Sequence, residues 1–180
     1  MKIIYFPGLI MHSIQDLWQQ LKNNQPDLKK YLLPGASLAE IQGTEDFLGV
    51  EFPVSFRECY LIHNGLAQKR FIEYWRLFPL IEIKEMWIQC KKLRVLDGLD
   101  KEYNWNSNWI PFSMNMGGNL GCLNLDPNTE EDADDVPEGF SRVGELFIYF
   151  QDEKRVASQN MEFHEWFEDF LGIYDESDQE

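Results

Sequence analysis

The first 65 residues carry the hydrophobic pattern of three amphipathic helices. The first helix is predicted over residues 13–24, because four apolar residues recur there at helical spacing: Ile14, Leu17, Trp18 and Leu21. The second is predicted to begin at the capping box Ser37–Glu40 and to end at Gly49. The third is predicted over residues 55–63, ending at Asn64-Gly65, since both residues tolerate a left-handed backbone.

The remainder of the chain is dominated by strand patterns. A strand is predicted over residues 73–78 and a long helix over 81–96, followed by strands at 109–114, 120–125, 145–151 and 156–158 and by an amphipathic helix at 161–171. Helices before strands, with one closing helix, predict an α+β fold in which N-terminal helices pack on a largely antiparallel sheet. The length favours a single domain over residues 1–174 and a frayed acidic tail over 175–180.

The apolar residues of these elements predict one shared core. Hydrophobic residues make up 44% of the chain, including 13 Phe, 7 Tyr and 6 Trp, which excludes intrinsic disorder for most of it. The residues expected to share the core are Leu38, Ile41, Leu48, Ile62, Trp109, Ile110, Phe112, Leu123, Leu125, Phe147, Phe163, Trp166 and Phe167. The aromatic group Tyr103, Trp105 and Trp109 could form a ligand-stacking platform, but we interpret it as core packing.

Charge is distributed very unevenly along the chain. The 31 acidic and 16 basic side chains give a net charge of −15, and residues 1–125 are balanced, so the whole excess lies in residues 126–180. One acidic cluster falls between two predicted strands, in a stretch with Pro127, Pro137 and Gly139, and is therefore expected to form an exposed loop. We call residues 126–139 the acidic segment; its carboxylates are Asp126, Glu130, Glu131, Asp132, Asp134, Asp135 and Glu138.

The composition also indicates which partners and compartments to expect. An acidic chain lacks the positive surface that nucleic acids and anionic membranes require, so neither is an expected partner. The longest apolar run, Ile3 to Met11, contains Pro7-Gly8 and is too short to span a membrane; we interpret it as a strand or strand-like arm. Three widely spaced cysteines, Cys59, Cys90 and Cys122, favour reduced buried thiols and a cytoplasmic location.

Several short motifs recur in a distinctive order over roughly residues 32–127 and 160–172. They are Leu33–Ser37, Glu40-Ile41, Glu45, Leu48–Val50, Phe52-Pro53, His63–Gly65, Trp109–Phe112, Gly117–Asn119, Cys122–Pro127 and Phe163–Trp166, with Phe167 and Leu171. Together they resemble the SUKH superfamily, which includes fungal cell-wall assembly regulators and bacterial immunity proteins. The resemblance implies a compact α+β domain that binds other proteins and has no recognised catalytic site. For bacterial members it implies neutralisation of a cognate toxin, often a nuclease or deaminase.

Motifs for catalysis or metal binding are incomplete. Cys59 and His63 are four residues apart on a predicted helix, a spacing that suits zinc or a thiolate with its base, but no second ligand pair accompanies them. Asp126, Asn128 and Glu130 alternate as in a calcium loop, yet Glu131 stands where the sharp turn needs glycine. We therefore expect no catalytic residue, no metal and no cofactor.

These observations predict a non-enzymatic protein-binding domain, an immunity protein that neutralises a basic, nuclease- or deaminase-like toxin as a monomer or weak dimer. The alternative is an intracellular regulatory scaffold of the cell-wall assembly regulator type. The carboxylates of the acidic segment are the candidate partner-binding residues, because concentrating charge costs self-repulsion that solubility alone does not demand. The competing interpretation is that the acidic segment only solvates the protein.

Overall fold

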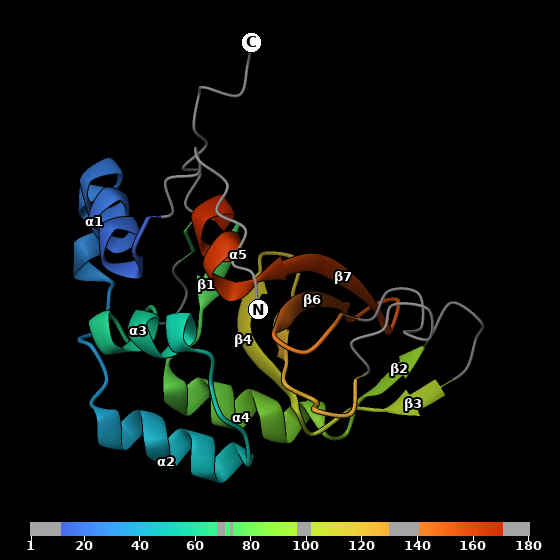
Figure 1. Ribbon diagram of the computed structural model, residues 1–180. Helices are drawn as coiled ribbons and strands as arrows, with labels where there is room; N and C mark the ends of the chain where they lie inside the picture. The colour runs from blue at the N-terminus through green and yellow to red at the C-terminus, as the bar shows by residue number, and fades with distance from the viewer. Residues whose placement is uncertain (1–11, 68–70, 73, 97–101, 130–140, 171–180) are drawn as a thin grey trace, which may run out of the picture.

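The computed structural model describes residues 12–67, 71–72, 74–96, 102–129 and 141–170. Within them, five α-helices and a seven-stranded sheet form an α+β architecture (Figure 1), as the order of the sequence patterns predicts. The predicted arm at 3–11 and the tail at 175–180 lie outside the described residues. No helix of the described part is long and apolar enough to cross a membrane.

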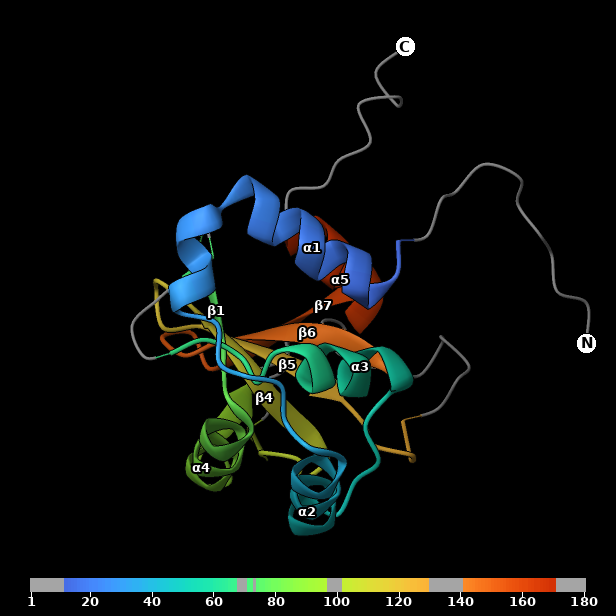
Figure 2. The same cartoon turned by 90° about the vertical axis from the view of Figure 1, so that its left-hand side faces the viewer.

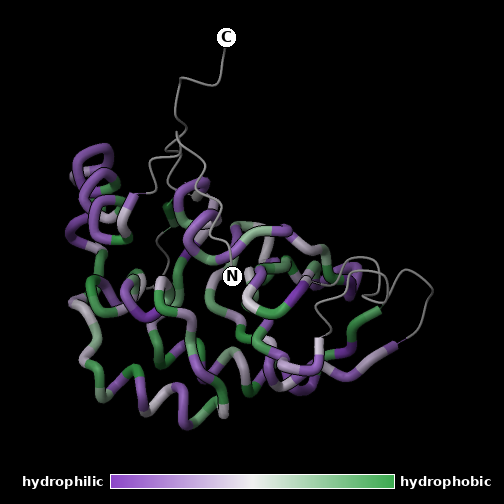
Figure 3. Tube along the Cα trace, viewed as in Figure 1, coloured by the Kyte–Doolittle hydropathy of each residue, from purple (hydrophilic) through white to green (hydrophobic). Residues whose placement is uncertain are grey.

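The N-terminal helices confirm the sequence prediction closely. They are α1 (Ile14–Asn24), α2 (Leu38–Leu48) and α3 (Val54–Ile62), with a short 3-10 helix, η1 (Pro26–Lys30), that the pattern did not predict. The Ser13 hydroxyl accepts the Asp16 N–H at 3.1 Å and the Asp16 carboxylate accepts the Ser13 N–H, so α1 begins with a complete capping box. Hydrophilic residues make up most of α1, interrupted by hydrophobic ones at helical spacing (Figure 3).

The sheet has the strand order β1-β4-β5-β6-β7-β2-β3 and is antiparallel except where β2 pairs with β7. The strands are β1 (Trp75–Leu77), β2 (Arg94–Leu96), β3 (Glu102–Asn104), β4 (Trp109–Asn115), β5 (Leu120–Asn124), β6 (Glu145–Phe150) and β7 (Arg155–Glu162). The closing helix α5 (Phe163–Phe170) continues directly from β7 and packs with α1 and α3, whereas α4 (Leu80–Cys90) lies beside α2 and against β4 (Figure 2).

The long helix predicted over 81–96 is wrong in its second half. The helix ends at Cys90, and residues 94–96 form β2, which pairs with both β3 and β7. Val95 is fully buried there. Residues 94–96 form hydrogen bonds with two other strands, and this pairing outweighs the helical spacing of the apolar residues. Such a tertiary effect is not visible in the local sequence pattern.

The closing strand is also longer than predicted. The pattern predicted a short strand at 156–158 and a helix from Met161, but β7 extends to Glu162 and α5 begins at Phe163. Between the pairs Phe147↔Ser158 and Glu145↔Glu162, four steps along β7 face only two along β6. This bulge accommodates two extra residues, which disrupts the alternation from which strand length is predicted.

The predicted core is confirmed except at its margin. A single cluster of buried residues includes Trp109, Phe112, Leu123, Phe147, Phe163, Trp166 and Phe167 together with Ile41 and Leu48. Leu38 is an error of the prediction, because it is 71% exposed at the first turn of α2. Ile62 and Leu125 are only partly buried against the core.

One aromatic contact set joins three parts of the chain. The Phe163 ring lies 4.9 Å from that of Phe56 on α3 and 5.6 Å from that of Phe112 on β4, measured between centroids. Phe56 and Phe112 are themselves 5.6 Å apart in an edge-to-face arrangement, and all three rings are fully buried. These rings therefore fix the closing helix to the sheet and to the N-terminal helices.

Replacing Phe163 with alanine should destabilise the protein by about 3–5 kcal/mol, because a fully buried aromatic ring leaves a cavity. The matched control is Leu38→Ala on the exposed side of α2, which should stay within about 0.5 kcal/mol of the parent. Urea unfolding followed by far-UV circular dichroism measures both values. Equal losses for the two variants would show that α5 is peripheral.

A buried carboxylate fixes the connection between α2 and α3. Glu45 is 2% exposed, and its Oε1 accepts the Phe52 N–H at 2.6 Å and the Arg57 Nε–H at 2.8 Å. Arg57 also contacts Glu51, whose side chain is 82% exposed. The sequence placed Glu45 in register with the apolar face of its helix, and the two donors explain how a charge can be buried there.

Glu45→Ala should lower the free energy of unfolding by about 3 kcal/mol, since it leaves a buried N–H unpaired and removes the Arg57 partner. Glu51→Gln removes the other carboxylate that contacts Arg57 and should cost less than about 1 kcal/mol, because that pair is exposed. Denaturant unfolding of the two variants compares the contacts directly. A loss at Glu51 as large as that at Glu45 would contradict the assignment.

Candidate functional site

The base of the acidic segment lies where β5 ends. Asp126 follows Leu125 and accepts hydrogen bonds from the Asn106 amide at 2.6 Å and from the Asn128 backbone N–H at 3.0 Å. Partial burial pushes the pKa of Asp126 up, but the hydrogen bonds from Asn128 and Asn106 outweigh it and hold the pKa below its ordinary value. Asp126 is thus ionised at neutral pH and stabilises the first turn of the segment.

The other six candidate carboxylates lie outside the described residues. They are Glu130, Glu131, Asp132, Asp134, Asp135 and Glu138. Their role in partner binding therefore stays a prediction, and only the two chain ends that lead into and out of the segment have described positions.

Asn124 holds those two ends together, a role that its place in the resembling range Cys122–Pro127 did not predict. Its side chain is 2% exposed, and its amide nitrogen donates to the Ser141 carbonyl at 2.7 Å and to the Thr129 hydroxyl at 3.2 Å. Its amide oxygen accepts the Asp126 N–H at 3.1 Å. Since Thr129 precedes the undescribed stretch and Ser141 follows it, one buried amide fixes the ends of the segment. The only sequence signal is an asparagine where the strand pattern expects an apolar residue.

The residues that suggested metal or thiol chemistry have structural contacts. Cys59 is 1% exposed, and burial raises the pKa of its thiol far above the ordinary value. His63 Nδ1 lies 3.1 Å from the Leu33 carbonyl, and burial lowers the pKa of this imidazole, which favours the neutral ring with Nδ1–H as donor. Among the described residues, no three His, Cys, Asp or Glu side chains gather closely enough to hold a metal ion.

The motif His63-Asn64-Gly65 has a packing explanation. The Asn64 side-chain oxygen accepts the Leu80 N–H at 2.9 Å and so caps the start of α4. Gly65 has φ +70°, and a Cβ at this position would lie 2.7 Å from the Phe78 backbone. Only glycine fits this close approach of two chain segments.

The aromatic group around Trp105 is part of the core, as predicted. Trp105 and Trp109 are 5% and 6% exposed, their ring centroids are 5.4 Å apart, and the Trp105 indole donates to the Trp109 carbonyl at 3.3 Å. Tyr103 differs, being 40% exposed on the edge strand β3.

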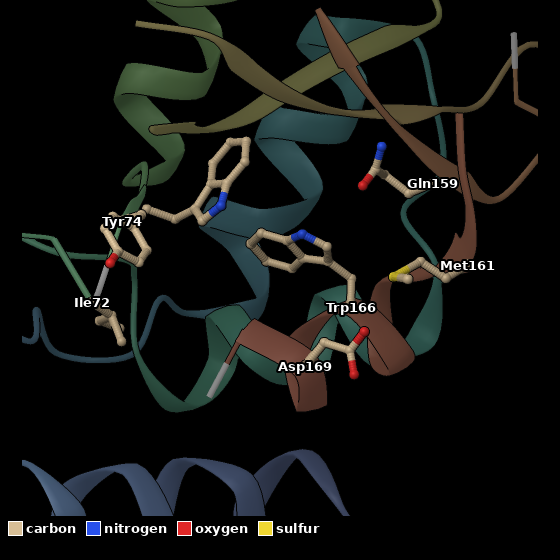
Figure 4. Close-up of a pocket in the computed structure, with 7 residues that line it drawn as sticks. Ile72, Tyr74, Gln159, Met161, Trp166 and Asp169 are labelled. Carbon is tan, nitrogen blue, oxygen red and sulfur yellow. The ribbon is translucent and has the colours of Figure 1, made fainter. Parts of the chain in front are cut away.

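A separate cavity of about 250 Å³ opens beside the other edge of the sheet. Its walls come from the edge strand β1, from the bulged part of β7 and from α5 (Figure 4). The Trp75 and Trp166 rings meet there at 83° with centroids 6.1 Å apart. The sequence pattern predicted Trp166 in the core but no cavity, because the two tryptophans are 91 residues apart in the chain.

The comparisons with known proteins identify a family. The sequence model of the SMI1 / KNR4 family (SUKH-1) matches residues 35–136, more than half of the chain. This range includes α2, α3, the β4–β5 hairpin and most of the acidic segment. A search of curated proteins finds no match to the chain.

Asn124→Ala should lower the free energy of unfolding by about 1–3 kcal/mol, because it leaves the Ser141 carbonyl and the Asp126 N–H without their buried partner. Asn128→Ala, on the exposed turn next to it, should change stability by less than about 0.5 kcal/mol. Thermal and urea unfolding measure both variants. An unchanged midpoint for Asn124→Ala would show that the ends of the segment are held by other contacts.

Proposed function

Because the chain belongs to the SMI1 / KNR4 family (SUKH-1), we propose that it is a protein-binding domain that acts as an immunity protein against a basic toxin. The cognate toxin would be a nuclease- or deaminase-like domain whose positive surface normally meets phosphates. The proposal assigns no catalytic step to this chain. It extends to a single domain over residues 1–174, which is supported by the burial of Ile14 and Phe167 in one cluster.

The charge distribution is the observation that carries this proposal. The whole net charge of −15 lies in residues 126–180, and the acidic segment is the part of that excess placed between two strands. Asn124 joins the chain on either side of the undescribed stretch, so the segment leaves the fold after β5 and returns to it before β6. Such a concentration of like charge attracts a basic protein over about 8 Å at physiological salt.

Residues that resemble the family pattern have structural contacts, which supports assigning recognition to the acidic segment. Glu45, Asn64 and Gly65 each satisfy a backbone group or permit a close approach inside the fold. These three residues therefore serve to hold the helices and the sheet together, and the proposal assigns recognition to the acidic segment instead.

Partner capture tests the proposal directly. The tagged chain is used to isolate its bound protein from the source cells, and the captured protein is then expressed alone and together with this chain. We expect growth arrest with the captured protein alone and rescue on co-expression. A captured protein that is harmless alone would contradict the immunity function and favour the regulatory scaffold.

Removing charge from the acidic segment should slow association with the captured toxin. The triple variant Glu130→Gln, Glu131→Gln, Asp132→Asn should reduce the on-rate roughly ten-fold at low salt, with a smaller effect on the dissociation rate. The reason is that long-range electrostatic attraction speeds the diffusional encounter of the two proteins rather than slowing their separation. The reduction should shrink as salt rises, since screening already removes the attraction. Stopped-flow or surface-binding kinetics over a salt series measures these rates.

The matched control removes the same three charges elsewhere, as Glu58→Gln, Glu85→Gln, Asp152→Asn. These side chains are exposed on α3, on α4 and in the β6–β7 turn. The control should lower the on-rate by less than about two-fold, because it changes net charge without changing the acidic segment. Equal effects of both variants would mean that only total charge matters and that the segment is a solvating surface.

A further inference from the structure

The cavity between β1, β7 and α5 has the composition of a cation site. Three of its walls are aromatic: Trp75 is half-buried, Trp166 is 7% exposed, and Tyr74 is 70% exposed at the mouth. The negative faces of such rings attract cations within about 6 Å of the ring centroid. The T-shaped arrangement of Trp75 and Trp166 gives the cavity two walls at nearly a right angle.

The carboxylate of Asp169 adds a negative charge to the rim. Asp169 is one turn after Trp166 on α5, so both side chains lie on the same side of the helix, and Figure 4 shows the carboxylate near the base of the Trp166 side chain. Asp169 is exposed, and it has no hydrogen-bond or ion-pair partner among the described residues. Glu168, by contrast, accepts a hydrogen bond from His12 at 3.3 Å.

The bulge in β7 brings polar and polarisable atoms to the same cavity. Gln159 and Met161 line it, and Asn160 between them has φ +51°, a left-handed conformation that is uncommon outside glycine. The Gln159 side-chain nitrogen donates to the carbonyls of Ala157 and Ser158, at 3.2 Å each. Its amide is therefore oriented with the nitrogen held by the backbone, which leaves the oxygen as an acceptor for a ligand.

We propose that this cavity, which we call the β1–α5 pocket, binds an arginine side chain presented by the protein partner. This proposal rests on the proposed function, from which it takes the class of partner, a basic protein. It adds a second recognition site on this chain. Trp75 pairs with Asn115, at the turn end of the β4–β5 hairpin, whereas Asp126 follows the other end of β5. None of the residues that line the pocket belongs to the acidic segment, so the two are different parts of the surface.

Arginine fits these walls better than the other cations of proteins. Its planar guanidinium stacks on aromatic faces and can donate two parallel hydrogen bonds to a carboxylate such as Asp169, while a further N–H reaches an amide oxygen such as that of Gln159. It is also less strongly hydrated than the ammonium of lysine, so entering a half-buried aromatic cavity costs it less. Lysine offers a single point charge and no flat surface.

The binding test uses a small probe and needs no toxin. N-acetyl-arginine amide is titrated into the ¹⁵N-labelled full chain, and the indole N–H signals of Trp75 and Trp166 are followed by NMR, with the lysine and citrulline analogues and tetramethylammonium as parallel arms. We expect the arginine probe to shift these two signals. The neutral citrulline probe should bind at least about five-fold more weakly, since it can form neither the cation–π contact nor the ion pair with Asp169.

Two variants at exposed positions test the walls without disturbing the core. Asp169→Asn should weaken the arginine probe about three- to five-fold, and Tyr74→Ala about two- to five-fold, as expected for losing an exposed ion pair and one cation–π contact. Glu85→Gln on α4, far from α5 in Figures 1 and 2, removes the same charge as the first variant and should leave binding unchanged. Far-UV circular dichroism confirms that the variants keep their fold.

The other outcomes overturn the inference in distinct ways. Equal binding of the citrulline and arginine probes would make the pocket a neutral apolar site, and tighter binding of the lysine probe or of tetramethylammonium would assign it to another cation. No shift of either indole signal would remove the site. Failure of toxin capture with a positive probe titration would reject the immunity function alone, whereas rescue by this chain with a negative titration would reject only the pocket.

Discussion

The contact of Phe163 with Phe56 and Phe112 is the constraint on which the other features depend. Phe163 is the first residue of α5, so its burial determines where β7 stops and the closing helix begins. The ring lies between α3 and β4, and one turn further along α5 the Trp166 ring meets that of Trp75 on β1. Phe163 thus belongs to the core, and Trp166, one turn further along the same helix, forms a wall of the β1–α5 pocket.

Polar side chains that pair with the backbone determine how the layers are connected. Glu45, Asn64 and Asn124 are each paired with backbone N–H or carbonyl groups at chain connections, where regular secondary structure leaves those groups unpaired. Apolar residues alone would hold the layers together, but they would not determine where each connection crosses the edge of a layer. These side chains determine it, because an unpaired buried N–H or carbonyl is costly.

Local signals made the elements with strong caps and turns predictable. The capping boxes at Ser13 and Ser37 are properties of a few adjacent residues, and the structure confirms the helices that they begin. The strand at 94–96 and the β7 bulge depend on partners far away in the chain, so periodicity could not reveal them. For the same reason, composition alone revealed the acidic segment. The Asn124 contacts at its base and the β1–α5 pocket depend on residues that are close only in the folded chain.

The amide of Asn124 has a consequence for how this fold can diversify. A single buried side chain joins Thr129, before the undescribed stretch, to Ser141 after it, so these two chain ends are held together by contacts of their own. Lengthening a loop whose ends are already held costs little, about 0.6 kcal/mol for each doubling of its length. We therefore expect changes of length or charge between Thr129 and Ser141 to leave the β5–β6 pairing intact.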